Sequence, residues 1–144
     1  MSDDELDNPA LLHREQNVEI VKRGIEAFNR RDIDAFDDLM TRDFEFITAM
    51  AGIENEIIRG REGVEKYFES LDDAWEEFVL VPGEFRDLGD SVLMLGRIEG
   101  RGRGSGVQVE TPDGVIYDFR DGKVCRTRAF LDHGEALEAA GLEG

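Results

Sequence analysis

The first half of the chain repeats apolar residues with the period of an α-helix. A first helix is expected from about 14 to 31, with an apolar face made by Val18, Val21, Ile25 and Phe28. A second, shorter helix is expected after Asp32, whose carboxylate suits the N-cap position. A third helix is expected from Gly60, with an apolar face made by Val64, Tyr67, Phe68, Leu71 and Trp75. The pattern therefore predicts three helices in the first half of the chain.

Strand patterns begin after the second predicted helix and dominate the second half of the chain. Residues 44–48 alternate and are rich in aromatic and β-branched side chains, which predicts a strand, followed by a loop over 49–60. Turn signals separate four further strand-like stretches, around 78–88, 91–103, 107–120 and 123–131. Short turns between consecutive strands predict an antiparallel meander. Asp132 and Glu135 resemble a capping box, which predicts a short C-terminal helix ending at Gly141.

Helices followed by strands indicate an α+β domain, in which one curved sheet packs against three helices. The length of 144 residues is that of one domain, and no internal repeat or linker divides it. We expect residues 1–13 to form an acidic arm, flexible or loosely helical, and residues 14–144 to form a single domain.

The charge is strongly negative, because 34 acidic residues face 17 basic ones and give a net charge of −17. Nucleic acids and anionic membranes attract positively charged surfaces, so neither partner is expected. The sequence shows no signal peptide or membrane span, and its single Cys125 excludes an internal disulfide, so a cytoplasmic protein is expected. The excess of acidic residues and the presence of only three lysines fit a protein adapted to a salt-rich cytoplasm. A high-GC genome, whose codons favour arginine over lysine, explains the scarcity of lysine equally well.

Four phrases carry a resemblance to a known family: Gly60–Val64, Gly100–Val107, Arg120–Val124 and Leu131–Leu142. In this order they resemble the SnoaL-like, ketosteroid isomerase-like branch of the nuclear transport factor 2-like superfamily, over about residues 15–142. The resemblance implies a cone-shaped fold, in which a strongly curved mixed or antiparallel sheet wraps around three N-terminal helices and leaves a deep pocket. Members include cyclases, isomerases, epoxide hydrolases, dehydratases and non-catalytic proteins, so the fold alone does not define the chemistry.

One catalytic set of the superfamily, that of the limonene epoxide hydrolases, is incomplete here. By resemblance, Arg97 and Glu99 match the Arg-x-Asp pair that holds and protonates the epoxide. The third acid of that set falls at Ala129, and the residues that position water fall at Phe46 and Thr48. An epoxide hydrolase site is therefore not expected.

The ketosteroid isomerase set is also incomplete. By resemblance, its general base falls at Thr48, which cannot take a proton from carbon. Its protonated oxyanion-hole Asp falls near Gly114 or Val115, and its catalytic Tyr falls at Phe28. Steroid isomerisation of that kind is therefore not expected.

The strongest candidates for chemistry are Glu99, Asp113 and Arg97. If the side of strand 107–120 that carries Asp113 faces the pocket, Asp113 could lie across from Glu99. Two carboxylates in an apolar cavity repel, so one of them would keep its proton near neutral pH. That arrangement suits proton transfer at a carbon next to a carbonyl, with Arg97 steadying the developing negative charge.

Structural explanations for the same residues stay open. Arg97 and Glu99 also fit an ion pair on an exposed sheet face, which is the commoner situation for such a pair. Pro112-Asp113-Gly114 fits a turn equally well, which would leave Asp113 in solvent.

The pocket itself is expected to be apolar and partly aromatic, which suits a small hydrophobic molecule. The candidate substrate-binding residues are Phe46, Thr48, Tyr67, Trp75, Val115, Tyr117 and Ala129. By resemblance, a homodimer through the outer face of the sheet is also expected, since members of this superfamily commonly pair there. The apolar residues that the sequence places on that face need covering. The set comprises Val92, Met94, Ile98, Ile116 and Phe130.

His13 and His133 lie at opposite ends of the chain, so no metal site is expected. The sequence predicts a SnoaL-like protein that binds a small hydrophobic molecule and carries out cofactor-independent acid/base chemistry of isomerase, cyclase or hydrolase type. The alternative, from a different class, is a non-catalytic ligand-binding or dimerisation module. The loss of every complete catalytic set compared above supports that alternative.

Overall fold

The structure is a computed structural model that describes residues 9–48 and 56–142, with side chains from residue 16 onward. Three helices come from the N-terminal half: α2 (Pro9–Arg30), α3 (Ile33–Asp38) and α4 (Gly60–Ala74). The strands are β1 (Met40–Ile47), β2 (Ile57–Arg59), β3 (Trp75–Asp87), β4 (Ser91–Gly102), β5 (Gln108–Arg120) and β6 (Lys123–Phe130). A last short helix, α5 (His133–Ala139), follows the sheet.

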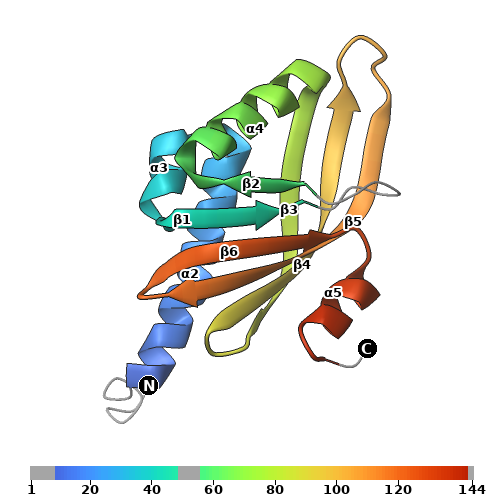
Figure 1. The fold of residues 1–144 in the computed structure, drawn as a ribbon. Helices are drawn as coiled ribbons and strands as arrows, with labels where there is room; N and C mark the ends of the chain where they lie inside the picture. Colours follow the sequence, from blue (N-terminus) through green and yellow to red (C-terminus); the bar gives the residue numbers. More distant parts are fainter. Residues whose placement is uncertain (1–8, 49–55, 143–144) are drawn as a thin grey trace.

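The strands form one strongly curved sheet in the order β2-β1-β6-β5-β4-β3. The β3–β6 strands form the predicted antiparallel meander, whereas β1 runs parallel to β6. Figure 1 shows α2, α3 and α4 on the concave side of this sheet and α5 on the other side. The strands β2 and β3 lie at the two edges, so the sheet stays open. The predicted α+β fold, a curved mixed sheet around three N-terminal helices, is confirmed.

The predicted capping residues act as expected. The Asp32 carboxylate accepts a hydrogen bond from the Ala35 amide at the start of α3, and Asp132 accepts one from Glu135 at the start of α5. Such bonds satisfy amides that the first turn of a helix leaves free.

Some predicted boundaries differ from the structure. Helix α2 begins at Pro9, inside the predicted arm, while residues 1–8 of that arm lie outside the described residues. The predicted loop over 49–60 is wrong at its end, because Ile57–Arg59 pair with β1 as β2. Three residues are too few for a periodic pattern to show in the sequence. None of the described helices is long and apolar enough to span a membrane.

The bend of the sheet depends on β3, β4 and their glycines. The β3–β4 register shifts at two places, between Trp75 and Glu77 and between Pro82 and Glu84. At Gly96 of β4, a Cβ atom would collide with the Val81 carbonyl oxygen of β3. Only glycine lets the two backbones come this close, and bulges of this kind increase local twist. This bend brings the sheet around α2 and leaves the space described below.

Each face of the sheet has its own core. On the concave side, the helices pack on buried residues that include Val92, Met94 and Tyr117. On the convex side, α5 packs on Leu93, Leu95 and Ile116. On this convex side, Ala136 of α5 packs closely on Gly114 of β5. A Cβ atom at position 114 would lie only 2.5 Å from the Cβ of Ala136, so glycine leaves the room that α5 needs.

These two cores correct the predicted outer face. The assignment is wrong for Val92, Met94 and Ile98, because the first two belong to the concave core and Ile98 packs against it. Ile116 and Phe130 do lie on the convex face, but α5 packs against both. The homodimer itself stays a prediction.

Candidate functional site

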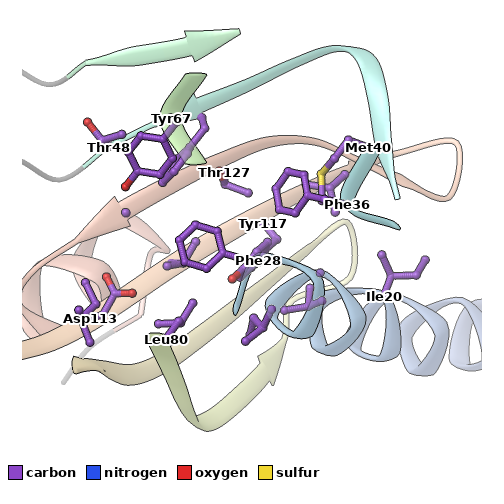
Figure 2. A pocket seen from close by; sticks show the side chains of 18 of the residues that line it. Ile20, Phe28, Phe36, Met40, Thr48, Tyr67, Leu80, Asp113, Tyr117 and Thr127 are labelled. Carbon is purple, nitrogen blue, oxygen red and sulfur yellow. The ribbon is translucent and has the colours of Figure 1, made fainter. Parts of the chain in front are cut away.

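A cavity of about 110 Å³ lies between α2, α3, α4 and the concave face of the sheet. Figure 2 shows it surrounded by apolar and aromatic side chains from segments far apart in the sequence. Its apolar walls include Ile20 and Phe28 of α2, Phe36 of α3, Leu80 of β3 and Val115 of β5. The arrangement follows from the bend of the sheet, because a flat sheet would pack directly on the helices.

Asp113 places a carboxyl group in this apolar cavity. It lies within β5, directly opposite Gly96 of β4, so the alternative prediction of a turn at 112–114 is wrong. Its side chain is only 4% exposed, and its Oδ1 has no hydrogen-bond partner among the described residues. In Figure 2 the carboxyl points toward the space beside Phe28 and Leu80. An unpaired buried carboxyl is costly in its ionised form, so its environment must change its acidity.

Burial raises the pKa of Asp113 from its ordinary value of 3.8 to about 7, while the nearby His133 acts in the opposite direction. Removing a carboxylate from water disfavours the charged form. Both the protonated and the ionised form of Asp113 are therefore populated near neutral pH. The expected cause, repulsion by a second carboxylate, is not needed.

Hydroxyl groups supply the remaining polarity of the cavity. Tyr67, Tyr117, Thr48 and Thr127 all line it. Burial and the neighbouring Asp113 raise the pKa of Tyr67 to about 12, and the same two causes raise the pKa of Tyr117. Both phenols therefore keep their protons near neutral pH and remain hydrogen-bond donors.

Polar contacts from Asn29 and Arg31 hold α2 against β3 beside the cavity. The amide of Asn29 in α2 donates to the Leu80 carbonyl, and the Leu80 amide donates back to Asn29, both at 2.9 Å. Arg31 donates to the Phe78 carbonyl at 2.9 Å, and its guanidinium lies over the Phe28 ring. These bonds fix α2 against β3, so the cavity wall has a defined position.

The described residues that line the cavity include no lysine, arginine or histidine, and Asp113 is the one carboxylic acid among them. Among these residues a bound anion would therefore find hydroxyl donors but no positively charged partner. Nor do the described parts of the chain hold three or more metal-ligating side chains grouped together.

Most of the predicted substrate-binding residues do meet in one place. Phe46, Thr48, Tyr67, Val115, Tyr117 and Ala129 line the cavity together with Asp113. Trp75 does not belong to the lining: its ring packs beside Phe78, with a centroid distance of 5.5 Å. Sequence reasoning missed Ile98 and Thr127, among others, although the uniformly apolar Val92, Met94 and Ile98 were a usable signal for the concave face.

Arg97 and Glu99 lie elsewhere. Arg97 donates to Glu99 at 3.0 Å and lies 3.7 Å from Glu110, and the Arg97 and Glu99 side chains are 48% and 41% exposed. Glu99 pairs with Glu110 across the strands, while Asp113 pairs with Gly96. The expectation that Glu99 faces Asp113 is therefore wrong, because odd-numbered residues of β4 point to the convex side.

A curved open sheet wrapped around three helices, with an apolar cavity between them, defines a nuclear transport factor 2-like fold. Residues 21–127 match the SnoaL-like domain, and the chain belongs to this family. A comparison with curated protein sequences gives no match.

Several solved structures share the fold. A candidate SnoaL-like polyketide cyclase from Jannaschia sp. is 24% identical, with a TM-score of 0.73, and the match covers 95% of this chain and 97% of that one. TerC, co-crystallised with polyporic acid, is 22% identical, with a TM-score of 0.72 and coverages of 88% and 98%. A nuclear transport factor 2-like protein from Burkholderia pseudomallei is 20% identical, with a TM-score of 0.72, and the match covers 85% of this chain and 95% of that one. At these identities the likeness extends to the fold alone.

Proposed function

We propose that this protein binds a small, mainly apolar organic molecule in the cavity, and that Asp113 exchanges a proton with it. One observation carries this proposal: a single buried carboxyl, without a partner for Oδ1 in the described chain, lies in an apolar cavity and has a pKa raised to about 7. A general acid or base works best when its pKa is near the working pH. Strongly shifted groups in cavities often have such a role.

The cavity suits proton transfer next to a carbonyl group. Ionised Asp113 takes a proton from the carbon beside the carbonyl, and protonated Asp113 returns it at another position. During the transfer, negative charge develops on the carbonyl oxygen, and a phenol such as Tyr67 is able to donate a hydrogen bond to it. This chemistry is of isomerase or cyclase type and uses only side chains of the chain itself.

The comparisons support a small organic ligand. TerC has the same fold and was co-crystallised with polyporic acid, and the Jannaschia protein is a candidate polyketide cyclase. The described lining offers no cation to balance an anionic group, which favours a molecule that is mainly neutral in the cavity.

A turnover assay tests the proposal. Candidate lactone, enone and epoxide substrates are offered to the wild type, to Asp113→Asn and to the matched control Glu99→Gln, which alters an exposed carboxylate. We expect Asp113→Asn to lower turnover by roughly 10²-fold or more, because it removes a proton-transfer group. Glu99→Gln should stay within about 2-fold of the wild type, as a surface pair contributes little. Activity that survives Asp113→Asn would rule out this role.

The second candidate is a non-catalytic ligand-binding module. It is favoured by the lining, in which the described residues offer no basic or second acidic side chain to assist Asp113. Native mass spectrometry of the purified protein separates the two candidates. A co-purified molecule that stays unchanged, together with no turnover of any substrate class, would favour binding alone. Sedimentation in the same preparation tests the predicted homodimer.

A further inference from the structure

His133 lies on the other side of the sheet from the cavity, at the start of α5. Its Nε2 is 2.8 Å from the Gly96 carbonyl oxygen. A carbonyl only accepts hydrogen bonds, so Nε2 carries the hydrogen and donates it. This bond fixes the orientation of the imidazole against β4.

Gly96 connects His133 to the candidate acid. The residue that binds the imidazole through its carbonyl is the residue directly opposite Asp113 in the β4–β5 pair. The backbone next to Asp113 is therefore also the backbone that holds His133.

We propose that His133 is a positioning residue that controls the charge of Asp113 from outside the cavity. A positively charged imidazole stabilises the carboxylate form of Asp113, and an uncharged side chain at this position lacks that effect. The field of His133 acts on Asp113 in this direction, against the larger effect of burial. This inference rests on the proposed function, since it gives the proposed acid/base a partner that adjusts its proton.

Other charged groups near the pair do not take this role. Glu84, Arg97 and Glu110 line the shallow depression on the convex face in which His133 lies. Arg97 is already paired with Glu99 and Glu110. Inside the cavity, Tyr67 and Tyr117 keep their protons, because burial raises the pKa of each. Histidine is the side-chain type that ordinarily changes charge near neutral pH.

A titration of Asp113 in the ligand-free protein tests the proposal. The ¹³C carboxyl signals of labelled aspartate are followed against pH, and Asp113→Asn identifies the signal of Asp113. His133→Gln keeps an N–H donor without a charge, and His133→Lys supplies a permanent cation. The control Lys123→Gln removes an exposed cation from the start of β6, and Lys123 is not among the groups that shift the pKa of Asp113.

The two variants should move the Asp113 titration in opposite directions. We expect His133→Gln to move its midpoint upward and His133→Lys to move it downward, each by ~0.5 pH unit or more, because a nearby charge acts strongly at a buried site. Lys123→Gln should leave it in place. Shifts in the same direction, or no shift in either variant, would overturn the proposal. The result needs no ligand, so it stands apart from the turnover assay: a failed assay leaves this coupling measurable.

Discussion

Asp113 and Glu99 are two carboxylates on neighbouring strands of one sheet, yet their surroundings have little in common. Asp113 is 4% exposed, faces the concave cavity and has an oxygen without a partner in the described chain. Glu99 faces the convex side, is 41% exposed and is paired with Arg97. The difference follows from strand parity, because successive side chains of a strand point to opposite faces. The face to which each strand position points therefore separates a candidate acid/base site from an ordinary surface ion pair.

The comparison also concerns stability. An exposed ion pair contributes little, because water and salt already screen its charges. A buried carboxyl without a partner is a cost to the folded state, which the rest of the fold must offset. Sites of this kind persist where the surrounding structure is strong enough to hold them.

The largest effect is expected at Gly96, where β3 and β4 approach each other opposite Asp113. We expect Gly96→Ala to destabilise the protein by about 3–5 kcal/mol, because the new Cβ meets backbone that cannot move aside. Gly114→Ala on the convex side should cost less, about 1–3 kcal/mol, since the neighbour is Ala136 on the short helix α5, which is able to shift. Urea unfolding of both variants measures the difference. Equal losses would show that the two faces are equally rigid.

Replacing Asp113 should make the protein more stable at neutral and higher pH. The folded pKa of Asp113, about 7, lies above its ordinary value of 3.8. As the pH rises from about 4 to about 7, the unfolded chain releases this proton while the folded protein retains it, so the wild type loses stability. Relative to the wild type, Asp113→Asn should gain about 2–4 kcal/mol between about pH 4 and pH 8.

The measurement is urea unfolding of both proteins across this pH range, with Glu99→Gln as the control. The control should keep a nearly constant difference from the wild type, because its carboxylate is exposed and paired. A constant difference for Asp113→Asn as well would mean that Asp113 ionises in the folded protein as it does in water.

The third effect on stability is expected from Asn29 of α2, the helix that packs over the cavity. Asn29→Ala removes both hydrogen bonds between α2 and Leu80 and leaves two backbone groups of β3 unpaired, which should cost about 1–3 kcal/mol. The control Ser70→Ala removes an exposed bond within α4 and should stay within about 0.5 kcal/mol of the wild type. If Asn29→Ala is as stable as the control, these two bonds do not hold α2 against the sheet.

The fold could be predicted because its signals are local and repeated. The apolar period of α2, the caps at Asp32 and Asp132, and the turn signals between β3, β4, β5 and β6 each describe a short stretch of chain. The strand β2 was missed because it has three residues and is defined by its pairing with β1. Pairing between distant segments leaves no periodic trace in a sequence.

The site could be predicted only in part. Asp113 and six of the predicted substrate-binding residues line the cavity. For Asp113, Val115 and Tyr117 the signal was the parity of β5, which places them on one side of the sheet. Glu99 was assigned to the wrong face, since Leu93 and Leu95 made both parities of β4 look equally buried. The reason is α5, which covers Leu93 and Leu95 on the convex side. No pattern within β4 reports where a helix forty residues later will pack.

The smallest effect on stability is expected from the surface ion pair of Arg97 and Glu99, which the sequence suggested as candidates for catalysis. Arg97→Gln breaks the ion pairs with Glu99 and Glu110 on the convex face, and should change stability by no more than about 0.5 kcal/mol. Because even this small change depends on screened charges, it should shrink further when salt is added. Urea unfolding at low and high salt checks both statements. A loss of several kcal/mol would mean that the convex face carries a buried interface, such as contact with a second copy of the chain, because only burial makes such an ion pair costly to break.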